Sequence, residues 1–260
     1  MLIHFYKYQG TGNDFVIIDN RSTGILLSSK QINHLCDRRF GIGADGLMML
    51  TEHPHLDFSM KYYNADGNES TMCGNGGRCL VAFARKMNII GDSTSFMAVD
   101  GQHEAILSAP EWIKLKMTNV EGIETSGNYF YLNTGSPHYV TFVEKTEDLD
   151  VYNLGRNIRY NERFSKEGTN VNFIELINEE SFNIRTYERG VEDETLSCGT
   201  GSVASAICAG LKLKTDTNSF SVHTQGGDLR VSFEKINDQL IREIWLEGPA
   251  NFVFEGDIIL

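Results

Sequence analysis

The chain has 260 residues, of which 41% are hydrophobic, and a formal net charge of −12. This length allows one large core or two of ordinary size, and the negative charge argues against a nucleic-acid partner, which needs clustered Lys and Arg. The sequence has no basic segment followed by a long apolar run at its start and no run of about eighteen apolar residues, so we expect a cytoplasmic protein without a membrane anchor.

The first half of the chain alternates strand-like and helix-like segments. Ser28 or Ser29 is the expected N-cap of the first helix, and Gly41 is its expected stop. A second helix is expected to end before Gly91, and a hairpin is expected to turn at Asp100–Gly101. In order, the segments are strand–turn–strand (3–19), helix (27–41), strand and loop (58–70), helix (76–90) and hairpin-rich strands (97–117).

The second half repeats this order. An offset of 125 residues, from Cys73 to Cys198, aligns CGNG with CGTG, ADGNESTMC with GVEDETLSC and DGLMML with NVNFIE. An offset of 124 aligns QGTGNDFV with NTGSPHYV. Four segments in one order at nearly one spacing indicate two copies of an α/β unit of roughly 120 residues. The second half is expected to contain strands at 129–143 and 171–188, a helix at 198–214 and a hairpin turning at Gly226–Gly227.

The segment Gly41–Gly46 matches G-x-G-x-x-G. A dinucleotide fingerprint needs a strand before it and a helix after it, whereas a helix-like segment precedes this one and a short apolar strand follows. We therefore expect no nucleotide site there.

Five cysteines are an odd number in a chain too large to depend on disulfides, so thiols are expected. Cys36, Cys79 and Cys208 lie among apolar neighbours, and we expect them to pack in the core. Cys73 and Cys198 occupy the same place in the repeat, where each opens a Gly-rich helix.

A helix N-terminus carries unpaired N–H groups and about half a positive charge, which lowers the pKa of a cysteine and attracts anions. Glycines let a ligand approach that backbone closely. The donors available to a carboxylate are the N–H groups of Gly74, Asn75 and Gly76 in one copy and of Gly199, Thr200 and Gly201 in the other.

Paired thiols suit the inversion of a carbon next to a carboxylate. The proton must leave from one face while another arrives from the opposite face, so two acid/base groups are needed. Preorganised N–H donors stabilise the charge that develops on the carboxylate oxygens.

No metal is expected, because C-x-x-C spacing and clustered histidines are absent from the sequence, and the same lack of C-x-x-C disfavours a disulfide oxidoreductase. A cysteine hydrolase stays open as an alternative, although it leaves the second motif unexplained.

The sequence resembles the diaminopimelate epimerase family over essentially its whole length. The matching motifs are GTGNDF, NADGNESTMCGNGGRC, NTGSPH, GTNVNF, YERGVEDETLSCGTG and GPA. The resemblance implies a cofactor-independent isomerase that interconverts LL- and meso-diaminopimelate in lysine and peptidoglycan-precursor synthesis, with a homodimer as one possibility. It also implies an α/β (α+β) fold of two pseudo-symmetric domains, each a mixed, largely antiparallel sheet or barrel around a central helix. The expected domains are 1–117, to which a strand at about 248–260 returns, and 118–247.

The resemblance assigns roles to individual residues. Cys73 and Cys198 correspond to the proton-transfer pair, and Arg189 suits the distal carboxylate because a guanidinium pairs with it bidentately. His138 and Glu188 match polar residues that set the protonation of the thiols. The matched carboxylate-holding positions are Gly74, Asn75, Gly199 and Thr200, and the other matched substrate positions are Asn13, Asn64, Asn133, Asn170, Glu188 and Arg189.

Residue chemistry alone leaves alternatives. Asn13, Asn133 and Asn170 stand in turn-like contexts where asparagine is ordinary, and His138 is by itself a loop histidine. Gly46 stands where a common family pattern has Gln, and the loop before Cys198 is one residue longer, which affects residues 192–194. Within the same fold the rival functions are a proline or hydroxyproline racemase, disfavoured because CGNG replaces the CGHG of those enzymes, and a thiol-free isomerase-like protein.

Overall fold

The computed structural model describes residues 1–109, 111–215 and 217–260. Its internal contacts divide the chain into two compact units. Unit 1 comprises Met1–Leu115 together with Gly248–Leu260, and unit 2 comprises Lys116–Glu247.

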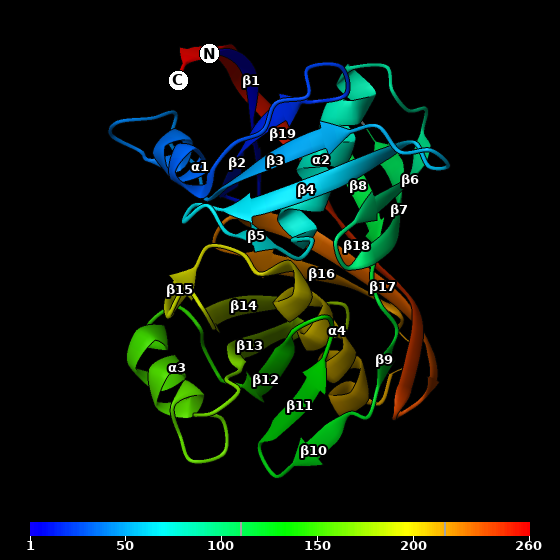
Figure 1. Cartoon of the computed structure of the whole chain (residues 1–260). Coiled ribbons are helices and arrows are strands. Elements are labelled where there is room, and N and C mark those ends of the chain that lie inside the picture. Colours follow the sequence, from blue (N-terminus) through cyan, green and yellow to red (C-terminus); the bar gives the residue numbers. More distant parts are fainter. Residues whose placement is uncertain (110, 216) are drawn as a thin grey trace. The chain divides into compact units, whose positions relative to one another are not determined.

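Unit 1 is a curved sheet with one helix packed against it and a second, shorter helix (Figure 1). The central helix, α2, is amphipathic, and it contacts β1, β2, β3 and β19 through a face that includes the fully buried Leu80 and Phe83. Its elements are β1 (Leu2–Gly10), β2 (Asn13–Asp19), α1 (Ser29–Cys36), β3 (Gly46–Thr51), β4 (Phe58–Asn64), β5 (Glu69–Ser70), α2 (Gly74–Lys86), β6 (Ser93–Ala98), β7 (Gly101–Ala109), β8 (Trp112–Lys116) and β19 (Asn251–Ile259).

Helix α1 begins as predicted but ends earlier than Gly41. Ser28 is the N-cap and forms a capping box with Gln31. The helix ends at Cys36, because the carboxylate of Asp37 accepts the backbone N–H groups of Arg39 and Phe40 and starts a turn. The segment Gly41–Gly46 therefore lies between α1 and strand β3, which is not the context of a dinucleotide site.

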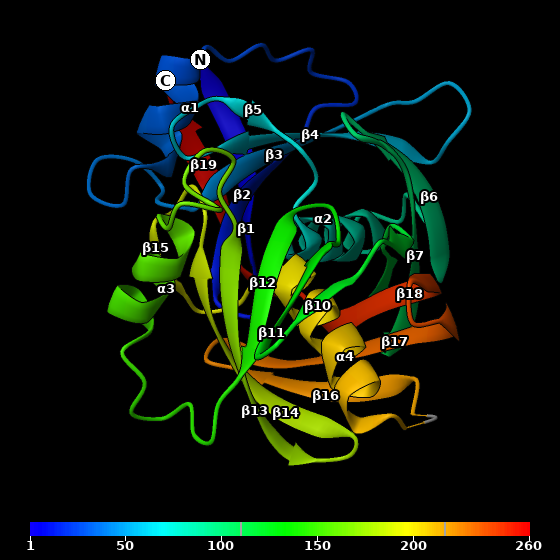
Figure 2. The ribbon, with the colours of Figure 1, turned by 90° about the horizontal axis from the view of Figure 1, so that it is seen from below.

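Unit 2 is a second curved sheet around a long helix, α4, which contacts β11, β12, β13, β14, β16 and β17 (Figure 2). From Gly201 to Gly210 every residue of α4 is buried. The elements are β9 (Val120–Glu121), β10 (Glu124–Ser126), β11 (Tyr129–Asn133), β12 (Pro137–Phe142), α3 (Val151–Arg159), β13 (Asn170–Asn178), β14 (Ser181–Glu188), β15 (Asp193–Thr195), α4 (Gly199–Leu213), β16 (Ser219–Thr224), β17 (Gly227–Asn237) and β18 (Leu240–Pro249).

The strands pair in the same order in both units. In unit 1, β1–β2 is antiparallel, β2–β3 parallel, β3–β4 antiparallel, β4–β6 parallel and β6–β7 antiparallel. In unit 2 the pairs β11–β12, β12–β13, β13–β14, β14–β16 and β16–β17 follow the same sequence of directions. The predicted fold class, two similar units with a largely antiparallel sheet around a central helix, is confirmed.

Both predicted hairpins are present, but each turns one residue earlier than predicted. Ala98 pairs with Gly101 and Thr224 pairs with Gly227, so the two-residue loops are residues 99–100 and 225–226, and Gly101 and Gly227 begin the next strands.

Candidate functional site

Helices α2 and α4 begin differently from α1 and α3. Ser28 and Asp150 cap α1 and α3 with their side chains, whereas α2 and α4 have Cys73 and Cys198 as N-caps in extended backbone, and neither side chain caps its helix. The first-turn N–H groups of α2 and α4 can therefore take an acceptor from outside the helix.

In unit 1 the Cys73 thiol lies beside Asn13, at the start of β2. The Cys73 Sγ is 3.7 Å from the Asn13 Oδ1, and the Asn13 Nδ2 donates to the Asp45 Oδ2 at 2.5 Å. Asp45 in turn accepts from Arg38, which also forms a bidentate pair with Asp14. This ionic group fixes the Asn13 amide with its oxygen toward the sulfur.

Lys7 also belongs to this ionic group. It is buried, donates to the Gly43 carbonyl and lies 2.8 Å from the Asp14 carboxylate. Burial alone would raise the pKa of Asp14, but hydrogen bonds from Arg38 and Lys7 hold that pKa well below its ordinary value. Asp14 is therefore an anion at all ordinary pH values, as the two cations require.

The first turn of α2 is held from inside by Arg78, which is completely buried. Its guanidinium donates to the Asn75 Oδ1 at 2.9 Å, and weaker contacts of 3.4 Å join it to the Gly74 and Pro249 carbonyls. Burial lowers the pKa of Arg78 to about 10, and it remains a cation at neutral pH. Asn75 is thus itself positioned by a buried charge.

Asn64 is the last residue of β4 and pairs directly with Gly46 of β3, which also pairs with Phe15 of β2. Residues 13, 15, 46 and 64 therefore lie on one face and toward one end of the unit 1 sheet. Cys73 joins this end through its contact with Asn13. The structure thus brings Asn13, Asn64, Cys73 and the first turn of α2 to the same end of unit 1.

In unit 2 the thiol of Cys198 lies 3.5 Å from the Thr200 hydroxyl, which is 3.0 Å from the His138 Nε2. The Thr200 carbonyl accepts from the Thr134 hydroxyl at 2.9 Å, which ties the helix start to the loop before β12. His138 is fully buried, and this burial lowers its pKa to about 3, so the imidazole is neutral.

Asn170 connects three segments at the same edge of the sheet. Its Nδ2 donates to the Ser136 Oγ at 2.8 Å and to the Pro137 carbonyl, and its Oδ1 accepts the Arg189 N–H at 2.9 Å. Asn170 also pairs with His138 in the β12–β13 ladder. The predicted residues Asn170, His138 and Arg189 are therefore neighbours.

Two other predicted residues lie near this edge and make local contacts. Glu188, the last residue of β14, accepts from the Thr195 hydroxyl at 3.0 Å. Asn133 is exposed, and its Oδ1 accepts the Gly135 N–H at 2.9 Å, which is a turn-stabilising bond. The exposed Arg189 side chain donates to the Glu167 carbonyl.

The remaining three cysteines pack in the core, as predicted. Cys36 is 4% exposed, and Cys79 and Cys208 are fully buried. Burial raises the pKa of Cys36 to about 11 and of Cys79 to about 12. These thiols are unreactive at neutral pH, so Cys73 and Cys198 are the two candidates for chemistry.

The similarity of the chain to known proteins identifies its family. A family model described as diaminopimelate epimerase matches residues 5–121 and 130–253. The chain belongs to the diaminopimelate epimerase family. The diaminopimelate epimerase of Flavobacterium psychrophilum is 53% identical over 257 residues, covering 97% of this chain and 99% of the relative. The diaminopimelate epimerase of Chlorobaculum tepidum is 43% identical over 259 residues, covering 96% and 99%.

Solved structures with lower identity share the fold. A phenazine biosynthesis protein of the PhzF family from Bacillus anthracis superposes with a TM-score of 0.75 at 15% identity, covering 100% of both chains. A hydroxyproline epimerase from Agrobacterium vitis gives a TM-score of 0.69 at 13% identity, covering 100% of this chain and 93% of that one.

The structure shows what surrounds Gly46 and the loop before Cys198, the two places where the sequence was expected to depart from the family pattern. At Gly46 a Cβ would come within 2.6 Å of both the Tyr62 ring and the Tyr63 carbonyl, so no side chain fits there. In the loop before Cys198, Glu192 pairs with Arg159 and Glu194 pairs bidentately with Arg185. These two carboxylates hold the loop in place.

The sequence did not indicate a role for Arg78, Ser136 or Asn172. Asn172 is fully buried and lies 3.1 Å from the His138 ring, and Ser136 holds Asn170. The only signal was their presence inside CGNGGRC, NTGSPH and GTNVNF, the motifs that carry the family resemblance.

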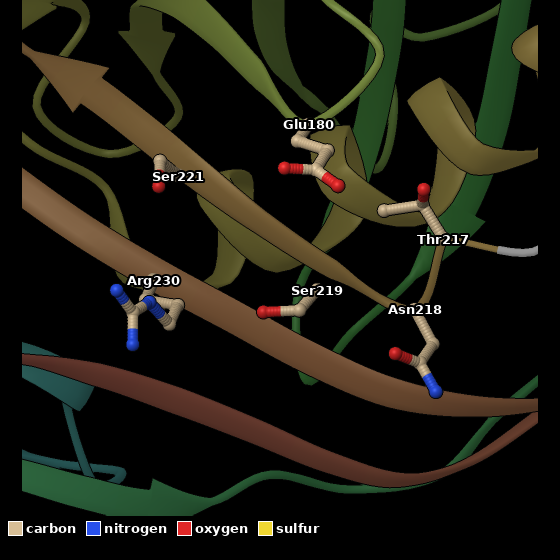
Figure 3. A pocket seen from close by; sticks show the side chains of 6 residues that line it. All are labelled: Glu180, Thr217, Asn218, Ser219, Ser221 and Arg230. Atoms are coloured by element: carbon tan, nitrogen blue, oxygen red, sulfur yellow. The ribbon is translucent and has the colours of Figure 1, made fainter.

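A separate hollow of about 290 Å³ lies on unit 2 and is lined by Glu180, Thr217, Asn218, Ser219, Ser221 and Arg230 (Figure 3). Glu180 follows the end of β13, whereas Asn170 begins that strand beside His138, so the hollow is at the opposite end of the sheet from Cys198. We assign it no part in the site.

Among the residues that the structure describes, no group of three or more His, Cys, Asp and Glu side chains could hold a metal ion. Within the same part of the chain, no helix has both the length and the apolar character needed to cross a membrane.

Proposed function

We propose that this protein epimerises diaminopimelate by a two-base mechanism in which Cys73 and Cys198 exchange the roles of base and acid. The observation that carries the proposal is the duplicated helix start. In each unit a cysteine is the N-cap residue of a Gly-rich helix, and the cysteine side chain makes no capping hydrogen bond to that helix. Membership of the diaminopimelate epimerase family supplies the substrate.

The chemistry balances without a further reactant. The thiolate of one cysteine takes the α-proton and becomes a thiol, and its electron pair leaves the C–H bond as a carbanion conjugated with the carboxylate. The thiol of the other cysteine then delivers its proton to the opposite face of the carbon and becomes a thiolate. In the reverse direction the two cysteines exchange roles.

The α-carboxylate would be held by backbone donors. We assign this role to the first-turn N–H groups that begin at Gly74 and Gly199, because donors fixed by a helix need no reorganisation as charge develops. Asn75, positioned by Arg78, and Thr200, positioned by Thr134, would complete these cradles.

The distal part of the substrate would be bound by polar side chains. Arg189 is exposed beside Asn170, and its guanidinium suits the second carboxylate. We assign the remaining contacts to Asn13, Asn64, Asn133, Asn170 and Glu188. A place in lysine and peptidoglycan-precursor synthesis, in the cytoplasm and as a homodimer, belongs to the same proposal.

The test uses isotope exchange and paired cysteine variants. In deuterated water, the wild type should place deuterium at the inverted α-carbon of LL-diaminopimelate, and proline should not turn over. Cys73→Ala and Cys198→Ala should each abolish epimerisation. Cys79→Ala is the matched control, because Cys79 lies on the same helix as the Cys73 cap but is fully buried, and it should keep turnover. Retained epimerisation in Cys198→Ala would refute the two-base scheme.

A further inference from the structure

The orientation of the Asn172 side chain is determined by its partners. Asn172 lies on β13 and is fully buried. Its Nδ2 is 3.0 Å from the Tyr139 backbone carbonyl, which can only accept a hydrogen bond, so the NH₂ group must face it. The Oδ1 accepts from the Thr186 hydroxyl at 3.0 Å on the other side. The amide therefore cannot be flipped without losing a bond.

The Asn172 amide in turn fixes the tautomer of His138. Its second N–H points at the His138 Nδ1 at 3.1 Å, so that nitrogen must present a lone pair. Since the buried ring is neutral, its single proton is on Nε2. The Nε2–H then donates to the Thr200 Oγ1 at 3.0 Å.

The hydroxyl group of Thr200 lies between His138 and the Cys198 sulfur. Its hydroxyl oxygen accepts the His138 proton, so its own proton is directed to its other neighbour, the Cys198 Sγ, at 3.5 Å. A donated hydrogen bond stabilises a thiolate more than a thiol, because bonds to charged groups are the stronger ones.

Asn13, a neighbour of the Cys73 sulfur, faces it with an acceptor and not with a donor. The Asn13 Nδ2 donates to Asp45, so the Oδ1 that faces Cys73 Sγ can only accept. This contact suits an S–H donor. Within their own units, the Cys73 sulfur thus has an amide oxygen as a neighbour and the Cys198 sulfur has a hydroxyl group.

We propose that Asn172 is a positioning residue, which holds His138 as its Nε2–H tautomer so that the Thr200 hydroxyl donates a hydrogen bond to the Cys198 sulfur. No proton travels along this chain, because His138 stays neutral and Thr200 only turns its hydroxyl. The consequence for turnover rests on the proposed function, but the tautomer and the donor can be measured without substrate.

The first test observes the tautomer directly. The protein is labelled with ¹⁵N-histidine, and the resonances of His138 are assigned by their loss in His138→Gln. In the wild type, Nε2 should carry the proton and Nδ1 should have the shift of an unprotonated ring nitrogen. Asn172→Asp replaces the donor by an acceptor of the same shape and should move a proton onto Nδ1. A wild-type ring protonated on Nδ1 would overturn the proposal, whether or not the variant folds.

The second test measures the donor at the sulfur. The rate of Cys198 alkylation by iodoacetamide at neutral pH is followed by mass spectrometry of its peptide. Thr200→Val should slow it about tenfold, the effect of losing one hydrogen bond to a charged group, and Thr200→Ser should restore it. The rate at Cys73 in the same samples is the internal control and should not change. An unchanged Cys198 rate in Thr200→Val would refute the donor role, and this result is independent of whether diaminopimelate is the substrate.

Discussion

An ordinary histidine titrates near neutral pH, whereas the buried His138 is neutral there. Its burial lowers the pKa from 6.5 to about 3, so the unfolded chain binds a proton between these values that the folded chain does not bind. Stability must therefore fall as the pH is lowered below about 6.5, at a rate that approaches 1.4 kcal/mol per pH unit for this one group.

This dependence is measurable as the free energy of unfolding between about pH 7 and pH 5, where most carboxylates remain ionised. His138→Gln should reduce the slope of the unfolding free energy against pH by up to about 1.4 kcal/mol per pH unit, whatever its effect on the absolute stability. His55→Gln, which removes an exposed imidazole, is the matched control. An equal slope in wild type and His138→Gln would show that the imidazole is not held neutral.

At the scale of the element, helix α4 contains two glycines that differ in the space around them. A Cβ at Gly201 would overlap the Asn172 Oδ1 and lie 3.3 Å from the Cys198 sulfur. A Cβ at Gly210 would make ordinary contacts, at 3.4 Å or more, with Phe233 and Phe220.

Gly201→Ala should therefore destabilise the protein by about 1–3 kcal/mol, as overpacking does, and should lower epimerase activity because it displaces Asn172. Gly210→Ala should be neutral or stabilise the protein by up to about 1 kcal/mol, because alanine favours a helix. Denaturant unfolding and turnover of both variants check this. Equal effects of the two changes would mean that the Gly201 contact has no special role.

The helix starts could be predicted from the sequence because the same Cys-Gly-x-Gly pattern occurs twice at one spacing. Helix α3 could not be predicted, since Gly155 in its middle normally disfavours a helix. In the structure a Cβ at Gly155 would overlap the Tyr187 ring, so the glycine lets α3 lie close to β14. A tertiary contact therefore outweighed local propensity.

Residue roles were predictable only where a motif carries them. Cys73 and Cys198 stood out by their duplicated position, whereas nothing in the sequence indicates that Arg78 is fully buried under the first turn of α2. Similarly, nothing in the sequence indicates that Asn172 is fully buried or that the Tyr139 carbonyl determines the direction of its amide. Such directions depend on side-chain partners that are distant in sequence.

At the scale of the whole molecule, unit 1 is built from both ends of the chain. Strand β19 pairs with β1 from Leu2↔Ile259 to Gln9↔Asn251, and α2 contacts both strands. Unit 2, by contrast, is one continuous segment, Lys116–Glu247. Loss of β19 should therefore remove an entire neighbour of β1 while leaving the chain of unit 2 intact.

Deleting residues 251–260 leaves the β1 backbone groups that bond β19 without partners and exposes apolar surface, including the buried Phe5, which packs edge-on against Phe254. Hydrogen exchange followed by mass spectrometry should show that amides of α2 lose protection in this variant. Amides of α4 should retain most of theirs and serve as the internal control. Because Cys73 and Asn75 depend on α2, epimerase activity should be lost together with α2 protection. Full protection of α2 in the truncated chain would show that β1 and β2 suffice to hold the first thiol in place.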